Sequence, residues 1–337
     1  MTRVLVTGSA GFIGHALSRR LLGESHTVTG FDAFSDYYDV GLKRARHAEL
    51  AVFPSFEAVE ARLETPGALL ETVARTRPEI VVHLAAQAGV RYSIENPRSY
   101  VDSNLIGTAN LLEAVRTHPV RHLLLASTSS AYGGDARSPS RETDRAVTPV
   151  SFYAATKLAT EAMAHSYAHL FGVATTALRF FTVYGPWGRP DMALFLFTRK
   201  ILAGEPIEVF SGGSAERDFT YIDDLVEALV RVIDRVPAKP GDGGPVCAAD
   251  TLSPVAPYRL VNIGGGRPVR LDRMIETLEQ ALGRTARRIP LPLPPGDVSA
   301  TRASTELLQA LIGTVPETPL DVGLPAFVRW YRAFYGA

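Results

Sequence analysis

The chain has 337 residues, of which 46% are hydrophobic, and it carries 35 basic and 35 acidic side chains. This length allows a large core in one or two domains. The balanced charge gives no general attraction to nucleic acid or to an anionic membrane, so neither is expected as a partner. The single cysteine, Cys247, excludes an internal disulfide and is typical of a reducing compartment.

The pattern of apolar residues also indicates whether the chain has a signal peptide or a membrane-spanning segment. An apolar, strand-like run begins by Val4, without the features of a signal peptide. No apolar run is long enough to span a bilayer. The sequence therefore predicts a soluble cytoplasmic protein.

A glycine-rich stretch follows the first expected strand. Residues 4–7 read as a buried parallel strand, and residues 8–14 (GSAGFIG) lead into an amphipathic run at 15–22. Such a loop presents backbone N–H groups and a helix N-terminus to a pyrophosphate. The spacing is G-x-x-G-x-x-G, not the commoner G-x-G-x-x-G, and a tight turn without a ligand is the alternative. The position after the first strand favours dinucleotide binding.

The second expected strand, residues 27–31, ends at Asp32. A carboxylate at this place accepts hydrogen bonds from the adenosine ribose and would repel a 2′-phosphate. The cofactor is therefore predicted to be NAD and not NADP. A carboxylate that only caps a turn is the alternative.

Later strand ends carry small or hydroxyl side chains. Residues 80–84 read as a strand that runs into the small residues 85–89, which would let the backbone approach a cofactor closely. Residues 97–116 read as one long helix that contains Asn104. The strand at 121–126 opens onto the hydroxyl-rich run 127–133, at the sheet edge where open α/β sheets bind ligands. These hydroxyls could bind a reacting oxygen, or form an ordinary polar turn.

Tyr153 and Lys157 lie in an Ala-rich, helix-favouring run that follows Pro149. On a helix, residues four apart project from one face, one turn apart. A tyrosine pKa of about 10 makes a poor base at neutral pH. A nearby lysine cation, and a bound nicotinamide cation, would favour the phenolate, so Tyr153 could act as a general acid/base. A Tyr-x-x-x-Lys spacing alone is weak, and an ordinary surface pair is the alternative.

Strands and helices alternate through Phe180, which predicts an α/β fold: a doubly wound parallel (Rossmann) sheet with a smaller C-terminal α/β substrate lobe. We expect residues 1–182, with 221–263 returning to them, to form the NAD-binding domain. Residues 183–220 and 264–337 would form the second lobe. Its expected elements include a helix from Ala193 and others at 271–282 and 327–335. Residues 237–257, rich in Pro and Gly, read as a surface loop or mobile insertion.

Two site classes are not supported by the sequence. His165 and His169 are four residues apart on the helix of Tyr153, but no third ligand is apparent, so no metal site is predicted. They are better explained as surface or subunit-contact histidines. No G-x-S-x-G segment is present, which argues against a serine hydrolase.

With the glycine loop, the hydroxyl run and Tyr-x-x-x-Lys in this order, the chain resembles the extended short-chain dehydrogenase/reductases. Within them it is most similar to UDP-glucuronate 4-epimerases. The similar stretches span nearly the whole chain, at residues 31–39, 83–93, 151–157, 178–193 and 217–224.

The resemblance implies a role for individual residues. Tyr153 would be the base, Lys157 its partner, and Thr128 the Ser/Thr of the family. The positions that match cofactor contacts are Gly8, Gly11, Phe12, Ile13, Gly14, Asp32, Leu84, Ala85, Ala86 and Asn104, together with Tyr153 and Lys157. The positions that match substrate contacts are Gln87, Gly89, Arg91, Ser127, Ser129, Ser130, Thr182, Arg189, Val209, Phe210, Arg217 and Asp297.

Some of these substrate positions have a specific implied role. Arg217 matches an arginine on the diphosphate, Asp297 matches a ribose-binding carboxylate, and residues 209–210 fall where the uracil is held. Thr182 replaces the asparagine of the galactose-type epimerases, which fits a uronic acid better than a neutral hexose. Arg189 is then a candidate for the substrate side near that carboxylate.

The chain departs from the family pattern in three places. Arg62 replaces an aspartate that touches adenine, and Pro294 replaces a polar residue near the diphosphate. The segment 237–257 is longer than is usual in the family. Cofactor binding could be differently arranged at Arg62 as a result, and Arg217 could carry more of the diphosphate contact.

The implied activity is an NAD-dependent 4-epimerase of a UDP-uronic acid, acting by transient C4 oxidation, rotation of the 4-keto sugar and re-reduction. UDP-glucuronate decarboxylase and UDP-glucose 4-epimerase are alternatives on the same fold. An NAD-sensing scaffold is the non-enzyme alternative, although intact Tyr153, Lys157 and Thr128 argue against it. The family is commonly dimeric through two long helices, so a homodimer is expected.

Overall fold

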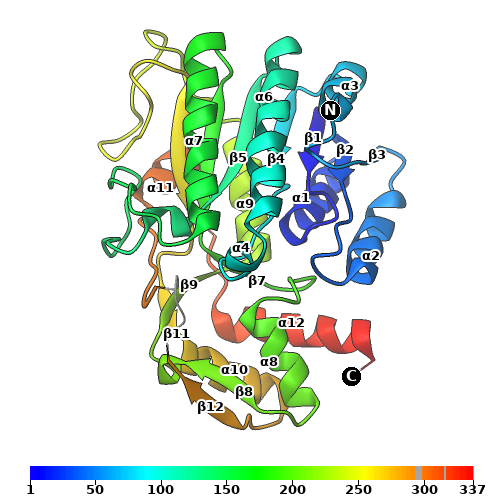
Figure 1. Ribbon diagram of the computed structural model, residues 1–337, viewed down its shortest axis with the longest axis vertical. Coiled ribbons are helices and arrows are strands. Elements are labelled where there is room, and N and C mark those ends of the chain that lie inside the picture. Colours follow the sequence, from blue (N-terminus) through cyan, green and yellow to red (C-terminus); the bar gives the residue numbers. More distant parts are fainter. Residues whose placement is uncertain (293–297, 315, 337) are drawn as a thin grey trace.

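The computed structural model describes residues 1–292, 298–314 and 316–336. A parallel sheet with helices on both faces forms the upper part of the view in Figure 1, and smaller sheets and helices lie below it. No helix among the described residues is both long and apolar enough to cross a bilayer.

The large sheet has seven strands in the order β10-β6-β5-β4-β1-β2-β3, and every neighbouring pair is parallel. The predicted doubly wound sheet is therefore confirmed. The strand order reverses between β1 and β4, and in such sheets this switch point opens a crevice at the carboxyl ends of the strands. The strands are β1 (Arg3–Thr7), β2 (Thr27–Asp32), β3 (Phe56–Glu60), β4 (Ile80–His83), β5 (His122–Thr128), β6 (Thr175–Phe180) and β10 (Tyr258–Ile263).

Two apolar cores flank this sheet. One lies under α1 (Phe12–Gly23), α9 (Ile222–Ile233) and α11 (Glu306–Ile312), and the other under α3 (Ala68–Thr76), α6 (Gly107–Thr117) and α7 (Phe152–Phe171). The helix α2 (Val40–Ala51) packs beside α1. Because α11 packs on β10 and α9 through Leu307, Leu308, Leu311 and Ile312, residues 306–312 lie with the sheet and not in the second lobe as expected.

The helix expected at 97–116 differs from a regular α-helix. After α4 (Tyr92–Glu95), the chain forms α5 (Pro97–Tyr100), a π-helical segment η1 (Val101–Ile106) and then α6. Such π-turns are rare and frequently mark functional sites. This one contains Asn104, whose side chain is 1% exposed.

The smaller lobe has its own core and carries two short sheets. One has three strands, β7 (Thr182–Tyr184), β9 (Glu216–Tyr221) and β11 (Pro268–Arg270), and the other pairs β8 (Ile207–Phe210) with β12 (Arg288–Leu291). Its helices are α8 (Ala193–Leu202), α10 (Leu271–Leu282) and α12 (Leu320–Tyr335). The last helix begins earlier than the expected start at 327 and contains Pro325. Short 3₁₀ turns are η2 (Ser129–Tyr132) and η3 (Ser211–Gly213).

The segment 237–257 is fastened to the body of the protein. Asp250 forms a bidentate ion pair with Arg259 of β10, at 2.8 and 3.1 Å. His165 Nε2 lies 2.9 Å from Ser253 Oγ, and His169 Nδ1 lies 2.8 Å from the carbonyl oxygen of Val255. The two histidines of α7 therefore contact this loop of their own chain.

Glu142 is a buried carboxyl group in the connection between η2 and α7, and it gives a pH-dependent prediction. Burial raises its pKa to about 7, against 4.5 for an ordinary glutamate, although Asn262 N donates a hydrogen bond to it at 2.9 Å. Between these two pH values the unfolded chain releases the proton and the folded chain keeps it. Ionised Glu142 therefore costs stability as the pH rises through this range.

We expect Glu142→Gln to be more stable than the wild type at pH 8, by up to about 3 kcal/mol, because each pKa unit corresponds to 1.36 kcal/mol. The difference should vanish near pH 4, where Glu142 is protonated in both states. Urea unfolding curves at the two pH values measure it. Equal stability differences at pH 4 and pH 8 would contradict the buried, proton-binding state of Glu142.

Candidate active site

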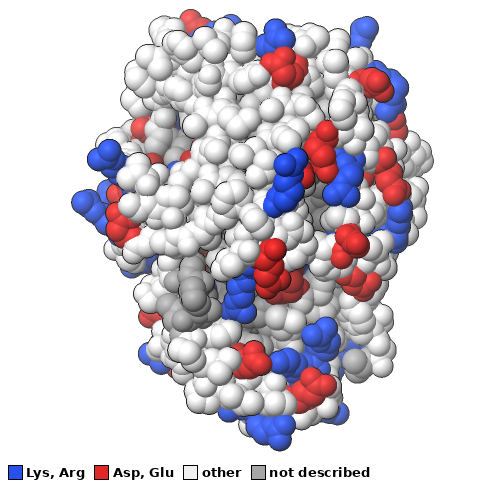
Figure 2. Space-filling view, in the orientation of Figure 1, with Lys and Arg blue, Asp and Glu red and all other residues white. Residues whose placement is uncertain are grey.

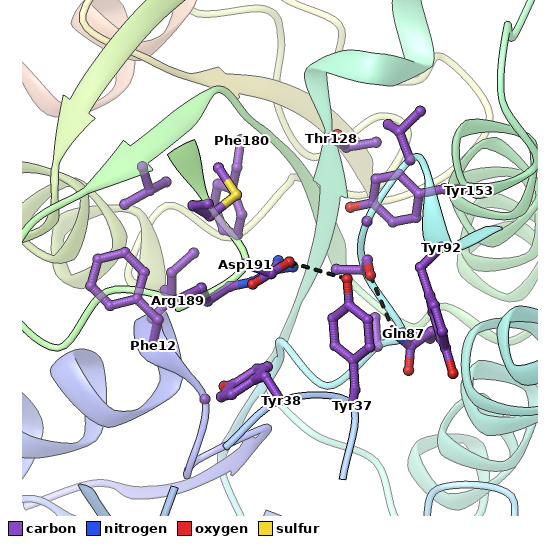
Figure 3. A pocket seen from close by; sticks show the side chains of 18 of the residues that line it. Phe12, Tyr37, Tyr38, Gln87, Tyr92, Thr128, Tyr153, Phe180, Arg189 and Asp191 are labelled. Carbon is purple, nitrogen blue, oxygen red and sulfur yellow. Dashed lines mark hydrogen bonds and ion pairs between the residues drawn. The ribbon is translucent and has the colours of Figure 1, made fainter. Parts of the chain in front are cut away.

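A cavity of about 930 Å³ lies at the carboxyl ends of β1, β2, β4 and β5, and the smaller lobe closes it from the other side. It is lined by residues from the glycine loop to β9, and Figure 3 shows part of this lining. Within the described residues, no group of three His, Cys, Asp or Glu side chains could hold a metal ion.

The glycine loop requires its glycines for steric reasons. Gly8 has a φ of +76°, and a Cβ atom there would lie 2.8 Å from the backbone nitrogen of Ala85. A Cβ on Gly14 would lie 2.0 Å from the carbonyl oxygen of Gly8. The loop is thus packed against the end of β4 and the start of α1. Gly11 is the N-cap of α1 and offers no side chain to cap it, so the first N–H groups of the helix suit a pyrophosphate.

Asp32 lies at the end of β2 and lines the same cavity. Its Oδ2 accepts a hydrogen bond from Ala10 N at 3.0 Å, and its Oδ1 accepts one from Phe34 N at 2.8 Å. The carboxylate therefore caps a turn and also fixes the glycine loop. The turn-capping role is therefore present, and the contact of Asp32 with an adenosine ribose stays a prediction.

Tyr153, Lys157 and Glu161 follow one another at intervals of four along α7. Ser151 is the N-cap of this helix, and its Oγ accepts a hydrogen bond from Ala154 N at 3.1 Å. Lys157 is 3% exposed, and burial lowers its pKa to about 8 although the charge of Glu161 opposes this. Glu161 is itself held by Arg179 of β6, in a bidentate ion pair with distances of 3.0 and 2.8 Å.

Thr128 lies beside Tyr153 (Figure 3). Its Oγ1 accepts a hydrogen bond from Ser130 N at 3.2 Å, so its own proton can point to the phenol oxygen. Burial raises the pKa of Tyr153, while Thr128 and the charge of Arg189 lower it. In the protein alone the pKa therefore lies above its ordinary value, and the stabilisation of the phenolate by Lys157 stays a prediction.

On the opposite wall, Arg189 is paired with Asp191 (Figure 3). The Nε–Oδ1 distance is 3.0 Å and the Nη2–Oδ2 distance is 2.5 Å. Tyr37 donates a hydrogen bond from its hydroxyl to the same carboxylate at 3.1 Å. Tyr37 and Asp191 were not predicted as site residues, although they fall within residues 31–39 and 178–193, two of the stretches that resemble the epimerases.

Most of the predicted site residues line this one cavity. These are Gly8, Gly11, Phe12, Ile13, Gly14, Asp32, Leu84, Ala85, Ala86, Gln87, Gly89, Arg91, Ser127, Thr128, Ser129, Ser130, Tyr153, Lys157, Thr182, Arg189, Phe210 and Arg217. Asn104 and Val209 are not in the lining, and Asp297 lies outside the described residues.

A family model for NAD dependent epimerases/dehydratases matches residues 4–243 of this chain. The chain belongs to the NAD dependent epimerase/dehydratase family. It is 52% identical to a probable UDP-glucuronate 4-epimerase of Rhizobium meliloti strain 1021 over 333 residues, which covers 99% of this chain and 98% of that protein. It is 45% identical to UDP-glucuronate 4-epimerase 1 of Arabidopsis thaliana over 341 residues, 99% of this chain and 77% of that protein.

A solved structure is similar over the same length. This is the UDP-glucuronic acid 4-epimerase of Bacillus cereus in complex with UDP-glucuronic acid and NAD, which is 31% identical with a TM-score of 0.88. The match covers 99% of this chain and 100% of that chain. The resemblance inferred from the sequence is therefore confirmed at the level of family and fold.

Three of the predicted site residues use or bury their side chains inside the protein, and two of them, Asn104 and Val209, do not line the cavity. Asn104 Oδ1 accepts from Gln87 N at 2.8 Å, and its Nδ2 donates to Gln87 O and Thr156 Oγ1 at 3.1 and 3.0 Å. Ser127 donates its hydroxyl proton to Glu161. Val209 is 3% exposed and points into the core of the smaller lobe.

Ser127 still lines the cavity, whereas Asn104 and Val209 support it from outside the lining. Asn104 ties the loop after β4 to α7, one turn from Tyr153. On β8, side chains alternate between the core and the cavity, so Phe210 faces the cavity and Val209 does not. Arg62 lines the cavity and pairs with Glu64 at 2.6 Å, so a carboxylate lies beside this unusual cation.

Proposed function

We propose that this protein is an NAD-dependent 4-epimerase that interconverts UDP-glucuronate and UDP-galacturonate. The observation that carries the proposal is the meeting of Thr128, Tyr153 and Lys157 above a glycine loop, opposite Thr182 and Arg189, in one cavity. The relatives that the chain matches over nearly all its length include UDP-glucuronate 4-epimerases.

The three residues on the sheet side would carry the proton chemistry. Tyr153 would take the proton of the sugar 4-hydroxyl, and Thr128 would hold the same oxygen through its hydroxyl. Lys157 is buried one turn away and would hold the cofactor ribose and stabilise the phenolate. Bound NAD would supply the redox chemistry, accepting a hydride from C4 and returning it to the opposite face.

The positive charge that the phenolate needs would come largely from the ligand side. Because burial raises the pKa of Tyr153, a nicotinamide cation nearby would be needed to favour the phenolate. The 4-keto sugar would turn about its diphosphate, held by Arg217 and Phe210, while the proton stays on Tyr153.

A uronic acid substrate adds a hazard, because the 4-keto intermediate is a β-keto acid. Carbon dioxide leaves when the C5–C6 bond lies perpendicular to the carbonyl plane; the bonding electrons then pass to C5, which takes a proton from water. Thr182, Arg189, Ser129 and Ser130 would hold the carboxylate near the carbonyl plane and suppress this loss. Ser127 is not included, since its hydroxyl donates its hydrogen bond to Glu161.

The direct test is to incubate the purified protein with UDP-glucuronate and NAD and to resolve the products. UDP-galacturonate supports the proposal. A UDP-pentose would indicate the decarboxylase alternative, and turnover of UDP-glucose alone would indicate a neutral-sugar epimerase. Retained NAD without turnover of any UDP-sugar would indicate the NAD-sensing scaffold.

Asp32 supports the choice of NAD, and its replacement gives a second prediction. Asp32→Asn removes the charge that would repel a 2′-phosphate and keeps one oxygen for the backbone N–H groups of Ala10 or Phe34. We expect the preference for NAD over NADP to fall by about tenfold, measured as the ratio of the two dissociation constants. Asp32→Ala should also lower the preference for NAD over NADP, but it should weaken the binding of both cofactors. A wild type that binds both cofactors equally would overturn this assignment.

We also propose a cytoplasmic homodimer that pairs through α6 and α7. Figure 2 shows few charged side chains over α7, and Leu170 and Phe171 near its end are 63% and 49% exposed. An exposed apolar surface of this kind is typical of an interface. A monomeric mass in light scattering would contradict the dimer.

A further inference from the structure

Arg46 of α2 is a buried cation that the chemistry described above does not use. Its side chain is 0% exposed. Nη1 donates to Ala10 O at 3.1 Å and to the Tyr38 hydroxyl at 2.8 Å, and Nη2 donates to Trp187 O at 2.6 Å and to Gly188 O at 3.1 Å. None of these four acceptors is a carboxylate.

A buried charge is costly unless its surroundings satisfy it closely. The planar guanidinium group divides its Nη donors between two parts of the site, while its buried Nε has no hydrogen-bond partner among the described residues. One nitrogen faces Ala10 in the glycine loop, and the other faces the backbone that leads directly to Arg189. A lysine could not span both, because its ammonium group is a single point.

The second contact holds a strained piece of backbone. Trp187 has a φ of +63°, a left-handed conformation that is an outlier for a bulky side chain. Its carbonyl oxygen and that of Gly188 both accept hydrogen bonds from Arg46 Nη2. The indole ring packs against His15 at 5.3 Å and against Trp330 of α12 at 5.3 Å. Backbone strain of this kind persists only where the surroundings over-determine it, and it clusters at ligand sites.

We propose that Arg46 is a positioning residue that sets the place of Arg189 relative to the glycine loop. It gives the cofactor loop and the carboxylate-binding loop one common rigid support. This inference rests on the proposed function, because its consequence is the control of the substrate carboxylate. When Arg46 is lost, Arg189 should shift, and the 4-keto sugar should lose carbon dioxide more often.

The test compares Arg46→Met and Arg46→Lys with the wild type on UDP-glucuronate, with NAD present. We expect the ratio of decarboxylated sugar to UDP-galacturonate to rise by about tenfold in both variants, since small displacements from reactive geometry have large effects. The inhibition constant of UDP should stay unchanged, because the nucleotide end is held by the other lobe. Arg259→Met is the matched control: it removes another buried arginine, paired with Asp250 in the loop 237–257, and should keep the wild-type product ratio.

The outcomes separate the possible explanations. A ratio that is raised in Arg46→Lys but not in Arg259→Met supports the positioning role of Arg46. Because Arg46→Lys keeps the buried cation, it still gives a test if Arg46→Met does not fold. Should Arg46→Lys also fail to fold, Tyr38→Phe removes one acceptor with little change of shape and should raise the ratio in the same direction. Wild-type ratios in the folded variants would overturn the inference. Absence of UDP-glucuronate turnover in the wild type would instead refute the proposed function.

Discussion

Tyr153→Phe should abolish turnover and leave NAD bound, because it removes the proton acceptor and nothing else from the site. General acid–base catalysis by one positioned group contributes at least about a hundredfold to the rate. We therefore expect the rate on UDP-glucuronate to fall by that factor or more. Cofactor content, measured after denaturing the purified variant, should match that of the wild type.

Two comparisons isolate the role of the Tyr153 hydroxyl. Lys157→Met should lose activity and also retain less cofactor, since Lys157 is proposed to hold the ribose. Tyr100→Phe is the matched control: its ring lies 6.0 Å from that of Tyr153, but its hydroxyl donates to the carbonyl oxygens of Ala88 and Gly89. Tyr100→Phe should lose far less activity than Tyr153→Phe. A Tyr153→Phe enzyme within tenfold of the wild type, about 1.4 kcal/mol, would remove Tyr153 from the mechanism.

The second large effect concerns the fate of the 4-keto intermediate. Thr182→Val keeps the shape of the side chain and deletes the hydroxyl proposed to hold the carboxylate. A hydrogen bond to a charged group contributes about 1.5–3 kcal/mol, so its loss should raise the share of decarboxylated sugar by about ten- to a hundredfold. Slower epimerisation should accompany this change. Chromatography of the products measures the share of decarboxylated sugar.

Arg189→Leu should shift the ratio in the same direction, although it also removes the ion-pair partner of Asp191. Thr198→Val is the matched control, because Thr198 is buried in α8 and bonds only the carbonyl oxygen of Leu194 among the contacts described. If Thr182→Val and Arg189→Leu both kept the wild-type ratio, the carboxylate would have to be held elsewhere.

Local geometry predicted one part of the site, and the resemblance to the epimerases supplied the rest. A glycine loop between strand and helix, and Tyr153 and Lys157 one helical turn apart, follow from spacing alone. On β8 the alternation of buried and facing side chains could have placed Phe210 in the cavity and Val209 in the core, and this signal was overlooked.

The contacts that were missed join residues far apart in the chain. Arg46 meets a carbonyl oxygen 141 residues away, and Tyr37 meets Asp191 across 154 residues. In the sequence, Arg46 is one of several basic residues on a polar helix, and nothing local indicates its burial. The π-turn at Asn104 likewise depends on its contacts with Gln87 and Thr156, which no helical pattern encodes.

The lobe boundary shows the same limit. Residues 306–312 follow a long stretch of the second lobe, so their order in the chain placed them there. Their apolar side chains pack instead on α9 and β10. The surface that α11 covers forms only when β10 and α9 have folded against each other.

The most direct measurement uses UDP-glucuronate that carries deuterium at C4, incubated with the purified protein in ordinary water. A hydride that leaves C4 and returns to it predicts UDP-galacturonate with the deuterium retained at C4, and no deuterium in the solvent. Product in which the label is exchanged for solvent hydrogen, or a labelled UDP-pentose in place of the epimer, would contradict 4-epimerisation by transient oxidation.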